Sequence, residues 1–228
     1  MVTVMTRELS WDEGRWTHEP VSTRVTTGGE SAGGESPGGA STGAGASGQA
    51  RSFVSGQAGS LVVEPEKGAD LWRVTSYGFV RDDAPALLAD LPDGSAMEVD
   101  LVLGGSEQFD QAGILVRADA ERWIKAGVEF ADGSLQVGAV VTNGVSDWST
   151  GQVPSWVGRR IGVRVSRSGD ALTVRARVED EPWRLVRLAP IDPSATWQAG
   201  PYCCAPSRAG LEVEFLAWRF GDADGALH

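Results

Sequence analysis

The sequence contains few of the residues that build metal sites and disulfide frameworks. Its two cysteines, Cys203 and Cys204, are adjacent, so they can close only a strained ring and cannot join distant strands. This arrangement favours a reducing compartment. The two histidines, His18 and His228, lie far apart in the sequence, which argues against a histidine-based zinc site or catalytic triad. We therefore predict no metal and no cofactor.

Long apolar runs are also absent. No stretch approaches the ~18 apolar residues of a membrane span, and residues 1–16 lack the apolar run of roughly 7–15 residues that a secretory signal contains. The chain has 31 acidic and 20 basic residues, and its net charge of −11 repels phosphate backbones and anionic membranes. These features predict a cytoplasmic protein that has neither nucleic acid nor a membrane as a partner.

Glycine and serine are concentrated between residues 26 and 50, where no aromatic residue and no aliphatic residue larger than alanine occurs. Such a segment cannot bury enough surface to offset its ordering entropy. The preceding segment contains Trp11 and Trp16, which favours its docking on the main body. The alternative is that this segment is a dispensable tail. In chain order we expect an N-terminal segment that docks on the main body (1–25), a disordered insertion (26–50), a single folded domain (51–221) and a flexible tail (222–228).

Apolar and polar residues alternate with a period of two through most of the remaining sequence, whereas helical periodicity is almost absent. Numerous strands at short spacing indicate an all-β protein built as a two-sheet sandwich. Strands are predicted at 60–64, 72–80, 96–103, 111–118, 122–130, 134–142, 161–166, 171–178, 183–188 and 211–220.

The run from Phe109 to Thr150 shows the alternation most clearly, with two unlike faces. One face is apolar and is predicted to lie in the core; it comprises Ala112, Ile114, Val116, Ile124, Ala126, Val128, Leu135, Val137, Ala139 and Val141. The other face mixes aromatic, amide and charged residues. It also carries a glycine on each strand, which would let a ligand approach the backbone; these are Gly113, Gly127 and Gly138.

Aromatic, amide, cationic and carboxylate groups on one sheet face suit sugar recognition, because a pyranose offers an apolar face for stacking and hydroxyls for hydrogen bonds. Trp123 and Trp148 would stack, and Lys125 would hold Glu129 or Asp147 ionised. Alternatively, Trp123 packs across strands and the charges pair with their neighbours. The predicted binding residues, on a concave sheet face, are Gln111, Arg117, Trp123, Lys125, Glu129, Asp147 and Trp148.

Several motifs carry a family resemblance. They are Phe109-Asp110-Gln111-Ala112-Gly113, Trp123-Ile124-Lys125-Ala126-Gly127-Val128-Glu129, Val141-Thr142-Asn143, Ser146-Asp147-Trp148-Ser149, the W-R-x-x-x-Y-G-F stretch from Trp72, and Gly200 to Pro206. They closely resemble the concanavalin A-like domains of unknown function named after a yeast regulator of enolase, over residues 8–25 and 53–220. The resemblance implies a concanavalin A-like (lectin/glucanase) jelly-roll β-sandwich, usually cytoplasmic and with no settled activity. Ala205 departs from the serine of the family pattern, and the insertion is a further departure.

A catalytic role has its own sequence signature, because glucanases of this fold carry an E-x-D-x-x-E pattern on one strand. Glu98 and Asp100 begin that pattern, but Leu103 stands where its last glutamate belongs. The incomplete motif disfavours an enzyme. Three functions remain open: recognition of a carbohydrate or polar small molecule, a protein-interaction module that regulates a metabolic enzyme, and a sugar-processing enzyme.

Overall fold

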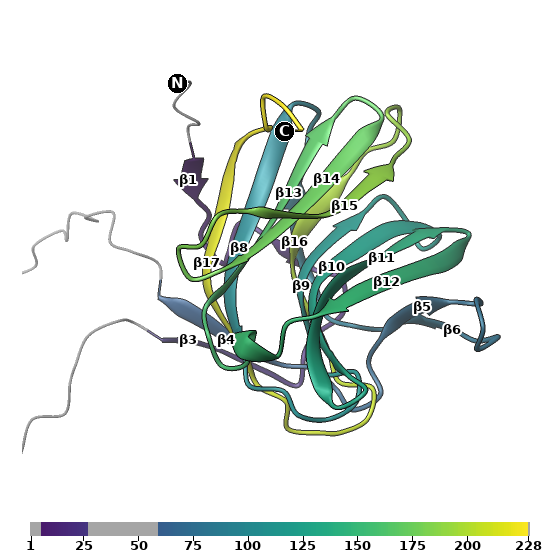
Figure 1. Ribbon diagram of the computed structural model, residues 1–228, viewed down its shortest axis with the longest axis vertical. Coiled ribbons are helices and arrows are strands. Elements are labelled where there is room, and N and C mark those ends of the chain that lie inside the picture. Colours follow the sequence, from purple (N-terminus) through teal and green to yellow (C-terminus); the bar gives the residue numbers. More distant parts are fainter. Residues whose placement is uncertain (1–5, 27–58, 228) are drawn as a thin grey trace, which may run out of the picture.

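The computed structural model describes residues 6–26 and 59–227. Apart from Thr26, the predicted insertion lies outside the described residues. The described chain folds into two packed antiparallel sheets and a separate two-stranded hairpin (Figure 1). One short 3₁₀ turn, η1 (Pro154–Trp156), accompanies the strands. The prediction of an all-β sandwich is thereby confirmed.

The eight-stranded sheet, hereafter the back sheet, contains both halves of the predicted hairpin at 161–178. Its neighbouring strands run antiparallel. The order is β15 (Arg184–Pro190), β14 (Ala171–Val178), β13 (Ile161–Ser168), β8 (Ser95–Leu103), β17 (Val213–Asp222), β4 (Ser60–Glu64) and β3 (Ser22–Thr26), and β1 (Thr6–Glu8) also pairs with β17.

The seven-stranded sheet, hereafter the front sheet, contains the Phe109–Thr150 run. Its order is β12 (Val145–Gln152), β11 (Ser134–Asn143), β10 (Arg122–Ala131), β9 (Gln111–Arg117), β16 (Gln198–Cys204), β7 (Leu87–Asp90) and β2 (Arg15–Trp16). The hairpin consists of β5 (Leu71–Arg73) and β6 (Val80–Asp82).

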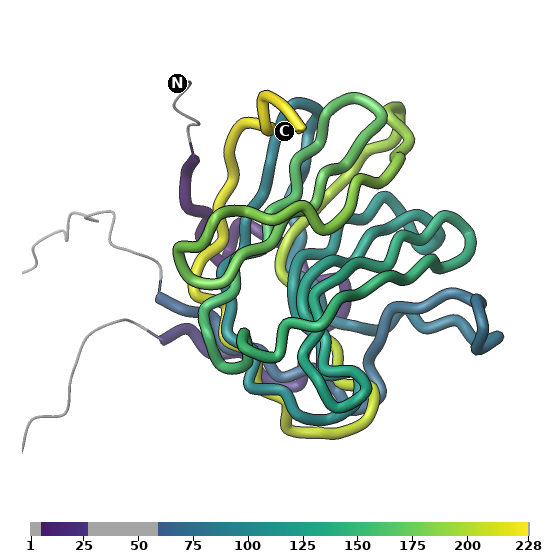
Figure 2. Tube along the Cα trace, viewed as in Figure 1, coloured from purple at the N-terminus to yellow at the C-terminus, as the bar shows by residue number. Residues whose placement is uncertain are grey.

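Residues 6–26 contribute strands to both sheets, along a path that can be followed in purple in Figure 2. The Trp11 ring stacks on Trp218 with ring centroids 6.2 Å apart. At the other end of the chain, the segment predicted to be a flexible tail makes specific contacts. The Asp224 carboxylate accepts hydrogen bonds from Arg164 Nε, at 2.9 Å, and from Arg175. Two arginines of the back sheet therefore hold this segment in place.

The core lies between the sheets, where the predicted apolar face of β9, β10 and β11 meets the back sheet. Ile114, Ile124 and Val128 are essentially inaccessible to solvent there. Met97, Val99 and Leu101 of β8 belong to the same cluster. The face assignment made from period-two alternation is therefore confirmed, because burial on one side of a sheet imposes that period.

The segment 72–80 differs from its prediction as one strand, because the chain reverses within it. Val74 and Ser76 have φ of 63° and 64°, and Gly78 has φ of 74°. The Gly78 N–H donates to the Val74 carbonyl at 2.6 Å, which closes the turn between β5 and β6. A left-handed conformation is unusual for a β-branched residue such as Val74, so the alternation alone gave no sign of the reversal.

The glycines of the front sheet permit close contact between strands. Gly127 of β10 is paired with Gly113 of β9, and a Cβ built on Gly127 would lie 2.2 Å from the Ala112 carbonyl oxygen. We expect Gly127→Ala to lower the free energy of unfolding by about 2–3 kcal/mol or more, because the backbone has to shift. Urea denaturation measures this loss. Gly151→Ala is the matched control, since a Cβ added to Gly151 would have no atom within 4 Å; an equal loss in both variants would contradict the interpretation.

Candidate ligand-binding site

The β5–β6 hairpin packs on the outer face of the front sheet, opposite the sandwich core. A second buried cluster joins the two; it consists of Leu71, Trp72, Ala84, Ala86, Leu88, Leu115, Trp123, Val140, Tyr202 and Cys204. Arg117 of β9 fixes the hairpin further, because its Nη1 and Nη2 donate to the two carboxylate oxygens of Asp82 at 2.5 and 2.7 Å. The hairpin thus forms one wall of a cavity whose floor is the sheet.

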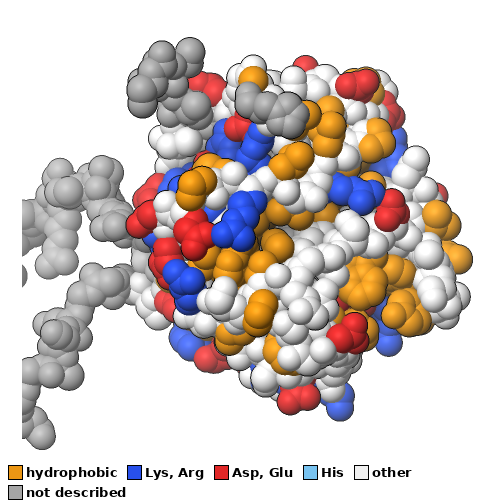
Figure 3. Space-filling view, in the orientation of Figure 1, with side chains coloured by type: hydrophobic (Ala, Val, Ile, Leu, Met, Phe, Trp, Pro, Cys, Tyr) orange, Lys and Arg blue, Asp and Glu red, His pale blue; other side chains and the backbone are white. Residues whose placement is uncertain are grey.

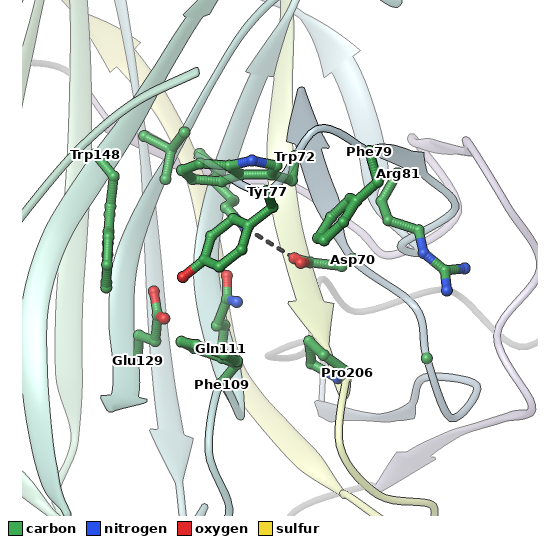
Figure 4. A pocket seen from close by; sticks show the side chains of 13 residues that line it. Asp70, Trp72, Tyr77, Phe79, Arg81, Phe109, Gln111, Glu129, Trp148 and Pro206 are labelled. Atoms are coloured by element: carbon green, nitrogen blue, oxygen red, sulfur yellow. Dashed lines mark hydrogen bonds and ion pairs between the residues drawn. The ribbon is translucent and has the colours of Figure 1, made fainter. Parts of the chain in front are cut away.

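The cavity has a volume of about 390 Å³, in the range of small-molecule sites. Figure 4 shows Trp148 and Glu129 on one side of it and Asp70, Phe79 and Pro206 on the other, with Tyr77 and Gln111 between them. In the space-filling view, hydrophobic side chains gather where β12 meets the hairpin (Figure 3). The lining residues are Gly68, Asp70, Trp72, Tyr77, Phe79, Arg81, Phe109, Gln111, Lys125, Glu129, Val140, Trp148 and Pro206.

Aromatic rings form much of the wall. Tyr77 packs edge-on against Trp72, with ring centroids 5.5 Å apart, and stacks with Phe79 at 5.6 Å. Tyr77 is 54% exposed, Phe79 is 45% exposed and Trp148 is 37% exposed. Much of each ring is therefore free of protein contacts and available to the apolar face of a ligand.

A buried ion pair lies in the floor. Lys125 Nζ is 2.9 Å from Asp70 Oδ1, and the two side chains are 4% and 17% exposed. Burial, the largest single influence, would by itself lower the pKa of Lys125, but the charge and hydrogen bond of Asp70, together with the nearby Cys204 and Glu129, outweigh it and the pKa is raised. Asp70 Oδ1 also accepts the Leu71 N–H at 2.8 Å. The lysine is therefore charged, and its charge is balanced within the floor.

Glu129 and Gln111 face the cavity without such partners. Burial raises the pKa of Glu129 to about 7, and the Lys125 charge only partly offsets this. Within residues 6–26 and 59–227, the buried Oε1 of Gln111 has no hydrogen-bond partner. An unsatisfied buried amide oxygen is unfavourable, so this atom marks a place where a ligand donor would be stabilised.

Four of the predicted site residues line the cavity: Gln111, Lys125, Glu129 and Trp148. The sequence suggested Glu129 or Asp147 as the partner of Lys125, whereas the structure pairs it with Asp70. Asp70 precedes β5, and only the folding of the hairpin onto the sheet brings it beside β10.

The other three predicted residues do not line the cavity. Trp123 is fully buried in the cluster beneath the hairpin, as in the packing alternative. Arg117 is engaged by Asp82. Asp147 extends to the opposite side of β12 from Trp148 and pairs with Arg187 of β15 at 2.7 Å, because successive side chains of a strand point to opposite faces. The three glycines of the same sheet face do not line the cavity either.

Sequence reasoning missed several lining residues, namely Asp70, Tyr77, Phe79 and Phe109. Tyr77 and Phe79 lie in the W-R-x-x-x-Y-G-F motif that carried part of the family resemblance. That motif was the available signal. It was assigned to the family but not to the site, because a single strand over 72–80 would not have folded back over the sheet.

The incomplete glucanase motif is remote from the cavity. Glu98 and Asp100 lie on the outer face of the back sheet, where Glu98 Oε1 accepts from Arg164 at 2.6 Å and Asp100 Oδ2 accepts from Arg219 at 2.7 Å. Both carboxylates are engaged by arginines. In the described part of the chain, no group of three or more His, Cys, Asp or Glu residues is placed to hold a metal ion. No helix in that part is long and apolar enough to cross a bilayer.

Fold and site together define a β-sandwich with an aromatic-lined cavity on the outer face of one sheet. The chain belongs to the family described as "Protein of unknown function (DUF1349)", whose model matches residues 49–223. It is 40% identical over 175 residues to Regulation of enolase protein 1 of Saccharomyces cerevisiae. The aligned region covers 75% of this chain and 87% of the yeast protein. The resemblance predicted from the motifs is therefore confirmed.

Solved structures with the same fold include two instructive cases. A functionally unknown protein from Saccharomyces cerevisiae superposes with a TM-score of 0.76 at 29% identity, covering 95% of this chain and 100% of the yeast chain. A xylan β-1,4-xylosidase from Bacillus halodurans superposes with a TM-score of 0.56 at 15% identity, covering 71% of this chain and 33% of the xylosidase. The second likeness concerns the fold alone.

Proposed function

We propose that the cavity binds a carbohydrate or a related polar small molecule. The observation that carries this proposal is the combination of exposed aromatic rings on the walls with the unpartnered Gln111 amide oxygen in the floor. Aromatic faces stack on the apolar face of a sugar ring, and the amide oxygen accepts a hydrogen bond from a hydroxyl. We further propose that the fold is a concanavalin A-like jelly roll. We also propose the cytoplasm as the compartment, because the two buried cysteines are free thiols.

Binding is favoured over hydrolysis. Glycoside hydrolysis requires two carboxyl groups that are free to act, one as the acid and one as the base or nucleophile. Glu129, with a pKa of about 7, has the protonation behaviour of an acid. Asp70, by contrast, is engaged by both Lys125 and the Leu71 N–H. A carboxylate held in this way is a poor partner for catalysis, so recognition is the better use of the site.

Trp148→Ala tests the proposal. We expect calorimetric titration with neutral mono- and oligosaccharides to reveal binding that weakens about 10-fold or more in this variant, because an aromatic wall worth at least ~1.4 kcal/mol is removed. Trp183→Ala is the matched control, since Trp183 packs against Arg177 of the back sheet, with the guanidinium carbon 4.3 Å from the ring centroid. Unchanged affinity in Trp148→Ala would refute the assignment of the site.

A second candidate function is regulation of a metabolic enzyme, which the name of the yeast relative favours. Val74 and Val80 of the hairpin are 43% and 50% exposed beside Tyr77 and Phe79. These side chains form an apolar surface that a protein partner could cover. Absence of sugar binding together with direct binding of purified enolase, lost when Tyr77 and Phe79 are both changed to serine, would favour this function over sugar recognition.

A further inference from the structure

Glu129 presents a negative charge to the cavity without a counter-charge of its own. Its side chain extends from β10 into the cavity beside Trp148 (Figure 4). Lys125, four residues earlier on the same strand, donates its hydrogen bond to Asp70 instead. Among the described residues, no hydrogen bond stabilises the Glu129 carboxyl group. A partly buried carboxylate in this state is unfavourable unless something else supplies a positive charge.

The other titratable groups nearby do not supply it. Asp70 and Lys125 compensate each other, and Asp132, which follows β10, is itself acidic. From β16, Tyr202 and Cys204 face the same region, but burial raises the pKa of both groups, so both are neutral at pH 7. The cavity therefore has an unbalanced negative charge whenever Glu129 is ionised.

One further cation lines the cavity, Arg81 of β6. Its Nη1 pairs with Asp83 at 3.1 Å. In Figure 4, Arg81 lies across the cavity from Trp148 and Glu129. The pair is half exposed, so the arginine charge is both matched and screened by solvent. It does not neutralise Glu129.

The walls around Glu129 are suited to a cation. The negative faces of aromatic rings attract ammonium groups within about 6 Å, most strongly when the cation is desolvated. Trp148, Tyr77 and Phe109 line the same cavity as Glu129, and the ring of Trp148 is 37% exposed. A carboxylate beside exposed aromatic faces provides both an ion-pair partner and cation–π contacts for one positive group.

We propose that the ligand is an amino sugar, alone or in a short oligomer, whose protonated amino group pairs with Glu129. This inference rests on the proposed function. The sugar hydroxyls serve as donors to Gln111 Oε1, the unpartnered acceptor in the floor. Gln111 Oε1 and the ionised Glu129 carboxylate both accept hydrogen bonds, which suits a ligand that carries hydroxyl and ammonium donors. The aromatic walls accommodate the apolar face of the ring.

The test compares four ligands that differ at one position of the ring: glucose, N-acetylglucosamine, glucosamine and N,N,N-trimethylglucosamine. The same comparison is made within the corresponding galactose set. Calorimetric titration at pH 7 should show glucosamine or galactosamine binding at least 10-fold more tightly than its N-acetyl form. Glu129→Gln preserves the shape but removes the charge, so in this variant the preference should vanish while the affinity for the N-acetyl form changes less than about two-fold.

The pH dependence gives a second readout. The trimethylated ligand keeps its charge at every pH, so its affinity reports on Glu129 alone. With a pKa of about 7, Glu129 is ionised in about a tenth of molecules at pH 6 and in about three quarters at pH 7.5, so the affinity should rise roughly eight-fold between them. A flat profile in wild-type protein would overturn the inference, as would a preference for amines that persists in Glu129→Gln.

The outcomes separate the two proposals. Tight binding of neutral sugars that depends on Trp148 but not on Glu129 would overturn the amino-sugar inference and leave sugar recognition standing. Binding of the trimethylated ligand and of tetramethylammonium with equal affinity would assign the site to simple cations and overturn both. If none of these sugars bound, both proposals would be wrong.

Discussion

Replacing Lys125 with methionine is expected to lower the free energy of unfolding by about 3–5 kcal/mol. Methionine keeps the length and much of the volume of the side chain but removes the ammonium group. The Asp70 carboxylate, which is 17% exposed and so mostly removed from solvent, would then have only the Leu71 N–H to stabilise its charge. Removing one partner of a buried ion pair is strongly destabilising, because the remaining charge is uncompensated. Urea denaturation followed by tryptophan fluorescence measures this change.

The double variant Lys125→Met with Asp70→Asn is the control. Neutralising both partners removes the uncompensated charge, so most of the lost stability should return, to within about 1–2 kcal/mol of the wild type. A loss below about 1 kcal/mol in the single variant would show that the pair contributes little. This result bears on function as well. Asp70 directly precedes β5, so its ion pair with Lys125 helps to fix the position of the β5–β6 hairpin on the sheet. A loss of ligand binding in Lys125 variants can therefore result from a displaced hairpin as well as from a lost ligand contact.

Alternation of side chains predicted much of the sandwich, because one physical cause, burial on one face, determines both the pattern and the fold. The strand predicted at 122–130 is β10 (Arg122–Ala131), and the strand predicted at 60–64 is β4 (Ser60–Glu64). The longer strands β12 (Val145–Gln152) and β16 (Gln198–Cys204) were not predicted, and β16 contains Pro201, which argues against a strand interior. Short strands such as β2 (Arg15–Trp16) and β7 (Leu87–Asp90) were not predicted either. Two to four residues contain too few alternations to distinguish a strand from a loop.

The site was only partly predictable, since it is formed by a hairpin that folds over a sheet. Alternation correctly placed Gln111, Lys125 and Glu129 on one face of the front sheet. It could not tell which residues of that face are covered, and so Trp123 was assigned to ligand binding although the hairpin buries it. Val74, whose φ is 63°, lies in the turn that reverses the chain, and a β-branched residue rarely adopts this conformation, so its residue type gave no signal of the turn.

Asp110→Ala is expected to produce the other large loss of stability, about 3–5 kcal/mol. Asp110 is completely buried just before β9. Its Oδ2 accepts hydrogen bonds from Arg208 Nη2 at 2.8 Å and from the N–H groups of Ser106 and Glu107 at 3.1 and 3.2 Å. Alanine would leave these partly buried donors without an acceptor and the Arg208 charge without its partner. Thermal and urea denaturation measure the loss.

Ser106→Ala is the matched control for that variant. It alters an exposed side chain in the same turn and keeps the backbone N–H that Asp110 accepts, so the stability should change by less than about 0.5 kcal/mol. Equal losses in both variants would mean that the turn, and not the carboxylate, is responsible.

Asp110 also lies between Phe109, whose φ is 69°, and Gln111, and both of these neighbours line the cavity. Asp110→Ala should therefore weaken ligand binding although Asp110 does not itself line the cavity, because this buried group holds Phe109 and Gln111 in position.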